Sequence, residues 1–421
     1  MERILIRGKR CNDNQCESTE SEWCMRSKTF FSDMIDEIDE AVEDIVEQIK
    51  GFELSKNSMG IVFADEEMDY PAFYEAFHKE FDFPLMGCTA MATLFGDIGY
   101  CDSGVSLMVL TADDCEFALD ITDSLDKSNG DAEIAGAYER ASSKLSEKEK
   151  LVISYGDVAT NQNDVSGDGL IKRLDEVVQG VPIFGGLATE AFNYKGSKVF
   201  CNDKAIDSGL VIALISGNIN PKYVSVNSIE NKSTFSFDIT KSKGNIIYEL
   251  NGKSLVKTLE DLDFIADKED VIGDYLLSPF VVTMKQPSGD KVYAARNLSY
   301  LNLEEGSGTF LGFMPEGAGL SIGIINREDV QKSVQIAFST MEEMIGGKSG
   351  YETLLCTTCC ARFLALANDV KAEARVCQEQ TPEGFSLFGM YSYGEFCPIK
   401  GEKTGKDYNM FHNFTFTILA I

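Results

Sequence analysis

The residues best suited to hold a small polar molecule lie near the C-terminal end of the chain. Arg362 carries a planar guanidinium that can bind a carboxylate through two parallel hydrogen bonds. Glu395 could receive an ammonium group, and Tyr391 or Tyr393 could cover that cation by cation–π contact. Together these groups would bind a zwitterion such as an amino acid. An internal salt bridge between Arg362 and Glu395 is the alternative, and a pair that separates when the ligand binds would satisfy both interpretations.

Glycines follow apolar β-type stretches at several places in the chain: Gly87, Gly185, Gly186 and Gly389. Such a glycine is typical of a strand that breaks where the backbone must pass close to something, so its amide could face a ligand. A tight turn is the alternative for any one of them. Because the pattern recurs, we expect these glycines, with Cys88 and Thr89 beside the first, to line one shared site.

Two cysteines and one histidine are candidates for other chemistry. Cys88 or Cys359 could act as the nucleophile of a hydrolase, for which His412 is the plausible general base. His412 is also the candidate axial ligand of a haem, with a hydrogen bond in a turn as its alternative role. Its neighbour Asn413 could offer an amide to a ligand or cap a turn.

Cys359 closes a CxxC segment that begins at Cys356, at a predicted strand-to-helix junction. A helix N-terminus would lower the pKa of a thiol there. One CxxC lacks the second pair of ligands that a zinc site requires, so tight packing of small residues is the favoured interpretation. We therefore expect no metal site and no cofactor, with haem as the exception that stays open.

The overall composition excludes several classes of partner. The chain has 421 residues, a formal net charge of −30 and a pI near 4.4. Non-specific binding to nucleic acid or to an anionic membrane needs an excess of Lys and Arg, so neither is expected. No apolar run is long enough for a signal peptide or a membrane span. Twelve cysteines in a chain of this length suit a reducing compartment, and we expect a cytoplasmic protein.

The elements that must position these residues follow a repeated order of strand, helix, strand and strand. Hydrophobic periodicity predicts three such units, with a degraded fourth over residues 254–325. The last two strands of each unit resemble hairpins. We therefore predict an α+β fold in which repeated β-α-β-β units form mixed sheets flanked by helices, in two domains.

Changes in composition suggest where these domains begin and end. Residues 1–27 are expected to form a polar leader, in which Cys11, Cys16 and Cys24 lack the spacing of a zinc module. An N-terminal domain is expected over residues 28–220. A C-terminal domain is expected over residues 221–421, because the chain changes character after Gly217.

Several motifs resemble those of a known family. Gly87-Cys88-Thr89-Ala90 and Phe184-Gly185-Gly186-Leu187-Ala188 are similar to the glycine signatures of the N-terminal FIST domain. Its C-terminal partner domain has motifs similar to Thr358-Cys359-Cys360-Ala361-Arg362, Gly389-Met390-Tyr391-Ser392-Tyr393-Gly394-Glu395 and His412-Asn413-Phe414-Thr415. The resemblance covers nearly everything after about residue 28, and the three C-terminal motifs in this order are its specific part.

The resemblance implies a sensory, ligand-binding module of bacterial signalling proteins that recognises small molecules such as amino acids. A subset of the family is associated with haem and nitric-oxide sensing. No kinase, cyclase or methyl-accepting region is attached, so we expect the output to pass to a separate signalling protein. The predicted function is a cytoplasmic sensor of a small polar metabolite; a haem-based nitric-oxide sensor is the alternative, and a cysteine-dependent hydrolase is the second alternative.

Overall fold

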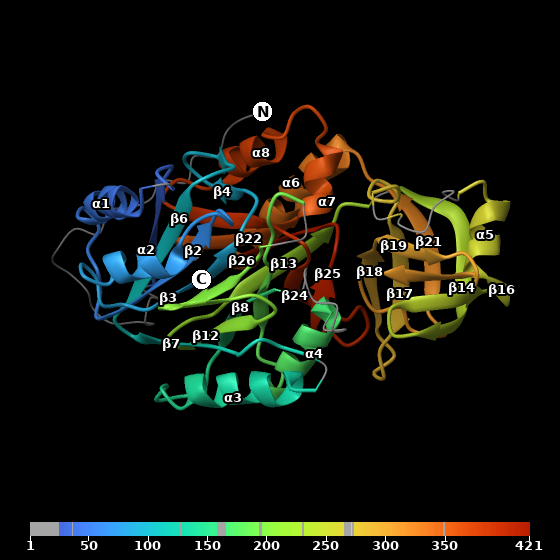
Figure 1. The fold of residues 1–421 in the computed structure, drawn as a ribbon, viewed down its shortest axis with the longest axis horizontal. Coiled ribbons are helices and arrows are strands. Elements are labelled where there is room, and N and C mark those ends of the chain that lie inside the picture. The colour runs from blue at the N-terminus through green and yellow to red at the C-terminus, as the bar shows by residue number, and fades with distance from the viewer. Residues whose placement is uncertain are drawn as a thin grey trace.

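The computed structural model describes residues 25–421, apart from residues 36, 127, 158–165, 193–195, 230, 265–270, 272 and 348–349. Cys11, Cys16 and Cys24 therefore lie outside the described residues, with most of the expected leader. Three six-stranded sheets and their helices form a broad body, and an eight-stranded sheet forms a second domain at one end of it (Figure 1). The predicted α+β class, with mixed sheets in two domains, is confirmed.

The first sheet of the body has the order β1-β6-β2-β3-β10-β11. Its strands are β1 (Arg26–Ser32), β2 (Asn57–Ala64), β3 (Leu85–Thr89), β6 (Val105–Ala112), β10 (Val199–Cys201) and β11 (Lys204–Ile206). Only β2 and β3 pair in parallel, since the other neighbours are antiparallel. Helices α1 (Ile38–Ile49) and α2 (Tyr70–Phe77) pack on its outer face.

The second sheet has the order β25-β24-β9-β8-β12-β7. Its strands are β7 (Cys115–Ile121), β8 (Leu151–Gly156), β9 (Ile183–Leu187), β12 (Leu210–Gly217), β24 (Glu395–Lys400) and β25 (Asp407–His412). Here β8 and β9 are the parallel pair. Helices α3 (Gly130–Ser142) and α4 (Gly167–Val178) cover its outer face.

The third sheet has the order β13-β26-β22-β23-β4-β5. Its strands are β4 (Thr93–Phe95), β5 (Tyr100–Cys101), β13 (Lys222–Asn227), β22 (Thr353–Cys359), β23 (Ser386–Ser392) and β26 (Thr415–Ala420). The parallel pair is β22 and β23. Helices α6 (Arg327–Ile345) and α8 (Ala372–Gln380) cover the sheet, and the short α7 (Cys360–Ala365) follows β22 directly.

The three sheets exchange hairpins in a cycle. Hairpin β10–β11 follows β9 in the chain but extends the first sheet beside β3. Hairpin β24–β25 follows β23 but extends the second sheet beside β9, and β4–β5 follows β3 but extends the third sheet beside β23. The inner faces of the sheets share one apolar core, in which aromatic rings from different sheets meet. The exchange therefore ties distant parts of the chain into one body.

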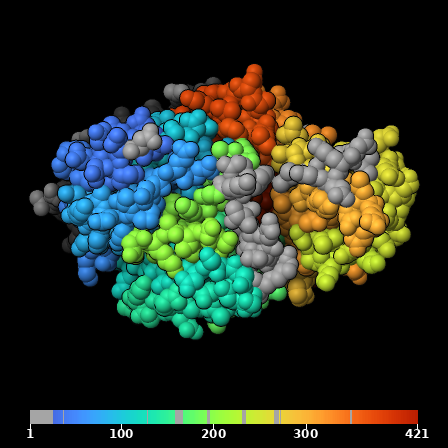
Figure 2. Space-filling model, in the orientation of Figure 1, coloured from blue at the N-terminus to red at the C-terminus, as the bar shows by residue number. Residues whose placement is uncertain are grey.

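The eight-stranded sheet is built from the chain between β13 and α6, and we call it the inserted sheet. Its strands are β14 (Asn231–Lys243), β15 (Ile246–Leu250), β16 (Lys253–Ser254), β17 (Phe280–Lys285), β18 (Lys291–Arg296), β19 (Leu298–Asn302), β20 (Ser307–Phe310) and β21 (Gly319–Ile324). They run in the order β18-β17-β21-β14-β15-β20-β19, with β16 beside β15, and α5 (Leu255–Asp261) packs in a separate apolar core. Figure 2 shows this sheet as a lobe beside the body.

Local sequence explains where several helices begin. The Asp69 side chain accepts a hydrogen bond from the backbone N–H of Ala72, and Pro71 lies in the first turn of α2. A capping box of Asn326 and Asp329 starts α6, and Gly346 in the left-handed conformation ends it. These signals are short-range, so they are readable in the sequence.

Three predictions about the elements are wrong. Residues 254–325 form antiparallel strands of the inserted sheet with one short helix, so they are not a degraded β-α-β-β unit. The sequence predicts one helix from Cys360 to about Ala374, but the segment is divided into α7 and α8, with Ala367 in the left-handed conformation between them. Strand β1 begins at Arg26, inside the segment expected to be leader. Among the described residues, no helix is both long and apolar enough to cross a membrane.

Candidate functional site

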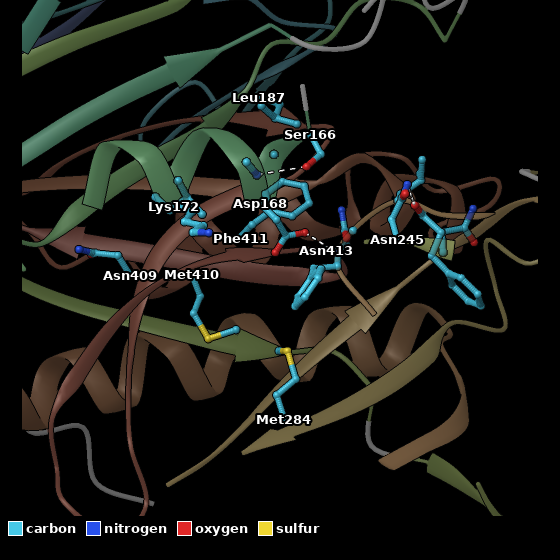
Figure 3. Close-up of a pocket in the computed structure, with 18 of the residues that line it drawn as sticks. Ser166, Asp168, Lys172, Leu187, Asn245, Met284, Asn409, Met410, Phe411 and Asn413 are labelled. Carbon is cyan, nitrogen blue, oxygen red and sulfur yellow. Dashed lines mark hydrogen bonds between the residues drawn. The ribbon is translucent and has the colours of Figure 1, made fainter. Parts of the chain in front are cut away.

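A cavity of about 1820 Å³ lies between the body and the inserted sheet. The body contributes one face of α4 with the residues at both its ends, strand β25, and residues 359–361 and 413–414. The inserted sheet contributes residues 243–246 and 310–313, with Met284. Figure 3 shows Met284 and Met410 approaching each other from the two sides, while Ser166, Asp168, Phe411 and Asn413 gather on another wall. Its walls are largely apolar and aromatic with a few polar groups, which is typical of a small-molecule site.

The N-terminus of α4 forms one wall of this cavity. The Ser166 hydroxyl accepts a hydrogen bond from the backbone N–H of Gly169 at 3.1 Å and so caps the helix. A Cβ at Gly167 would lie 2.3 Å from a ring carbon of Phe411, so only glycine lets the helix lie this close to β25. Asp168 is the second residue of the helix and lines the cavity.

The inserted sheet is fastened to β25 at both ends of β18. At one end, the buried carboxylate of Asp290 accepts hydrogen bonds from the backbone N–H groups of Lys403 and Thr404, at 2.8 and 2.9 Å, and from the hydroxyl of Tyr408 at 2.9 Å. These contacts, with the Ser288 and Thr404 hydroxyls, lower the pKa of Asp290. At the other end, Arg296 is fully buried and donates to the Phe411 carbonyl at 3.2 Å. The cavity lies beside this second attachment.

Three of the residues predicted to bind a ligand line the cavity: Cys359, Tyr393 and Asn413. The Tyr393 hydroxyl donates to Glu190 Oε1 at 2.6 Å. The Asn413 amide donates to the Tyr393 carbonyl at 3.2 Å, and its oxygen accepts from Arg296 Nη1 at 3.5 Å. The structure thus brings together one residue from each of the three C-terminal motifs.

Arg362 does not reach this cavity, and its ion-pair partner is not Glu395. Its Nη2 lies 2.5 Å from Glu373 Oε1, and both side chains are fully buried. The guanidinium also donates to the hydroxyls of Thr358 and Ser333, each at 2.8 Å. Of the two interpretations of Arg362, the structural salt bridge is the one that forms, although with a different acid. Tyr391 joins the same cluster, since its hydroxyl donates to Glu373 Oε2 at 3.0 Å.

Glu395 is fully buried just behind the cavity wall. Its Oε2 accepts from the Thr415 hydroxyl at 2.5 Å, whereas Oε1 has no hydrogen-bond partner among the described residues. Burial raises the pKa of Glu395 well above its usual value, and the nearby Cys359 adds to this effect. Burial thus favours the protonated form of this carboxyl group, and the ion pair that Arg362 forms is with Glu373.

The glycines predicted at strand breaks lie inside strands that have a parallel neighbour: Gly87 in β3, Gly185 and Gly186 in β9, and Gly389 in β23. A Cβ at Gly87 would lie 1.7 Å from the carbonyl oxygen of Val62, and one at Gly185 would lie 1.9 Å from that of Ser154. The expectation of a strand break is therefore wrong. The close approach is real, but it is to the neighbouring strand.

Cys88 and Thr89 lie in the interior of the body. The Cys88 thiol is 3.4 Å from the Met390 sulfur, and the Thr89 hydroxyl accepts from the backbone N–H of Lys198 at 3.0 Å. Thr189 connects two predicted segments, because its backbone N–H donates to the Thr89 carbonyl and its hydroxyl donates to the Tyr391 carbonyl, at 3.1 and 2.8 Å. Gly186 lies opposite Glu395 in the β9–β24 pair. These residues meet where the sheets join, not on the cavity wall.

His412 is buried and does not line the cavity. Its Nε2 donates to the Cys397 carbonyl at 2.9 Å, and burial lowers the pKa of the imidazole to about 4. Nε2 is thus engaged with the backbone and the ring is buried away from the cavity, so this arrangement does not fit haem held by His412. Among the described residues, no group of three or more His, Cys, Asp or Glu side chains is placed to hold a metal ion.

The cysteines in the described part of the chain are free thiols, and most of them are buried. Burial raises the pKa of Cys88, Cys356 and Cys359, which is the opposite of the lowering that a helix N-terminus was expected to cause. Cys356 faces the core beneath α6 and α8, whereas Cys359 packs with α7. This supports the packing interpretation of the CxxC segment, because a raised pKa disfavours the thiolate that a nucleophile needs.

Two residues were missed in the sequence: Asp168, which lines the cavity, and Arg296, its fully buried ion-pair partner. Asp168 follows a capping serine and a glycine at the start of a predicted helix, which marks a helix N-terminus but not a site. Arg296 ends an apolar strand, and a lone charge in such a strand is the signal that could have identified it as buried. Neither signal names the partner, because the two residues meet only across the two domains.

Comparison with known proteins places the chain in a family. The family model of the FIST N domain matches residues 58–253, and that of the FIST C domain matches residues 257–398. No curated protein matches the chain. A crystal structure of a chorismatase is similar at 8% sequence identity and a TM-score of 0.38, over 96% of this chain and 100% of that one, and it supports no functional statement. The chain therefore belongs to the FIST family, whose domains are sensory, ligand-binding domains in signal transduction.

Proposed function

We propose that this protein senses a small polar metabolite, such as an amino acid, that binds in the cavity between the body and the inserted sheet. The observation that carries the proposal is the convergence of Cys359, Tyr393 and Asn413 on one cavity. These residues come from the three motifs that make up the specific part of the family resemblance. A cavity between two domains also suits a sensor, because a ligand held there contacts both and can change how they dock.

The proposal extends to the location of the protein and to its signalling partner. We infer a cytoplasmic protein that passes its signal to a separate output protein. The net charge of −30 favours neither nucleic acid nor an anionic membrane as its partner. The shared strand order of the three body sheets supports an origin by internal repetition. Haem sensing has less support, since His412 Nε2 donates to a backbone carbonyl.

A thermal-shift screen across amino acids, nucleotides and haem tests the proposal. A ligand that binds only the folded protein at about 100 times its Kd stabilises it by about 2.7 kcal/mol, so Tm rises. The shift should fall in Asn413→Ala and Tyr393→Phe, each compared with its own unliganded Tm. Asn302→Ala, in the inserted sheet but away from the cavity, is the control and should keep the full shift.

Two results would overturn the proposal. One is that no compound raises the Tm of the wild-type protein. The other is that both cavity variants keep the whole shift, which would place the ligand elsewhere. An absorption band from bound haem that is lost in His412→Ala would favour the gas sensor.

A further inference from the structure

A fully buried cation, which does not itself line the cavity, forms an ion pair with an acid of the cavity wall. Arg296 is fully buried, and its Nη2 donates to Asp168 Oδ1 at 3.1 Å. Its Nη1 donates to the Ala295 carbonyl at 2.9 Å, and the guanidinium carbon lies 5.4 Å from the centre of the Phe411 ring. Its Nε has no hydrogen-bond partner among the described residues. The cation is thus held in place by neutral groups, and Asp168 is the acid with which it forms an ion pair.

Asp168 is positioned quite differently from Arg296. Its side chain is 22% exposed and lines the cavity, while that of Arg296 is 0% exposed. Its second oxygen, Oδ2, accepts from the backbone N–H of Phe313 in the inserted sheet at 2.7 Å. The carboxylate therefore stands between a buried guanidinium, a helix N-terminus and the inserted sheet, with one side open to the cavity.

Three features of this wall favour a carboxylate. A guanidinium binds a planar carboxylate in preference to a neutral group, and the N-terminus of α4 favours negative charge at the same place. Lys172, one turn further along the helix, also lines the cavity. The neighbouring wall is aromatic, with Phe313, Phe411 and Phe414. The matching ligand has a carboxylate at one end and an apolar or aromatic body.

We propose that Arg296 and the N-terminus of α4 are the anion-binding part of the cavity, and that Asp168 is a resident competitor that the carboxylate of the ligand displaces. This inference rests on the proposed function. When the Asp168 side chain moves away, its bond to the Phe313 N–H is lost as well. Binding of the anion thereby releases one contact between α4 and the inserted sheet, while the Asp290 attachment at the other end of β18 remains. The same displacement thus both recognises the ligand and changes the docking of the two domains.

Phenylacetate and its neutral analogue phenylacetamide are the probes, with Kd measured by calorimetry and Tm by thermal shift. Asp168→Asn removes the competitor and leaves Arg296 without an anion, so phenylacetate should bind about tenfold more tightly than to wild type. Phenylacetate should also restore the Tm that the Asp168→Asn protein loses. Phenylacetamide should do neither. Arg296→Lys keeps the charge but not the planar fork, and should weaken phenylacetate binding about tenfold.

Glu176→Gln is the matched control, because Glu176 lies on the same helix but is exposed and does not line the cavity. It removes the same charge without freeing Arg296, so it should leave the affinity for phenylacetate near the wild-type value. Equal tightening in both variants, equal binding of the two probes, or no phenylacetate binding to Asp168→Asn would each overturn the inference. If other compounds still raise the Tm of wild type, the proposed function survives that result; if none does, both fail. If the Arg296→Lys protein does not fold, the comparison of Asp168→Asn with wild type decides the inference.

Discussion

The guanidinium of Arg362 lies against the carboxylate of Glu373, with Nη2 and Oε1 2.5 Å apart and neither side chain exposed. Thr358 and Tyr391 donate to the same carboxylate, and the Arg362 side chain also lies over the Phe416 ring. A charge pair this well satisfied has no group left for a ligand. It fixes α7 and α8 to each other and to the third sheet, so its role is structural.

Breaking this pair should destabilise the protein strongly. Arg362→Met leaves the Glu373 carboxylate buried without its cation, which typically costs about 3–5 kcal/mol. The double variant Arg362→Met with Glu373→Leu removes both charges and should recover most of that loss, because it leaves no buried ion unpaired. Urea unfolding of the three proteins measures the difference. A single variant as stable as wild type would show that the pair is not buried as described.

His412 should make the protein less stable as the pH falls through the mildly acidic range. Its pKa is lowered to about 4 in the folded protein, against about 6.5 when unfolded. Between these values the unfolded chain binds the extra proton, so the free energy of unfolding falls by about 3 kcal/mol on acidification and is unaffected by this group above pH ~6.5. His412→Gln should flatten this dependence, as measured by denaturant unfolding at several pH values. The exposed His78 provides the control, and His78→Gln should retain the full slope.

Glu395 should make the protein less stable as the pH rises. Its pKa is raised by burial, so the folded protein keeps a proton that the unfolded chain releases above pH ~4.3. Its contribution is therefore greatest at low pH and is lost as the pH rises, by about 1.4 kcal/mol per pH unit while the folded form stays protonated. Glu395→Gln should be more stable than wild type at pH 7, with the difference vanishing near pH 4. The exposed Glu352 offers the control Glu352→Gln, and a Glu395→Gln protein less stable than wild type at pH 7 would contradict the burial of a neutral acid.

Acidification destabilises the folded protein through His412 and stabilises it through Glu395, so the two contributions can be measured separately. Both groups lie at the base of hairpin β24–β25, where Glu395 pairs with His412 across the two strands. A pH series on the two variants therefore reports on this hairpin, which carries the attachments of the inserted sheet.

Sequence by itself determined the local elements and the family. The stripe of apolar residues in α1, the cap and proline of α2 and the capping box of α6 are short-range signals that lie within or beside the helix they specify. Three of the predicted ligand-binding residues, Cys359, Tyr393 and Asn413, line the cavity, whereas the other eight do not. Glycine was correctly taken as a sign of close backbone approach, because no other residue fits within 2 Å of a carbonyl oxygen, as at Gly87.

Only the tertiary structure decided what these elements meet. The exchanged hairpins include strands as short as β5 (Tyr100–Cys101), whose pairing depends on partners far away in the chain. Arg362 has Glu373 and not Glu395 as its partner because α8 carries that acid under α7, and Arg296 meets Asp168 across two domains. Pairing between distant segments leaves no periodicity in the sequence, since it is set by how whole sheets pack, and so the cavity and its buried cation became visible only in three dimensions.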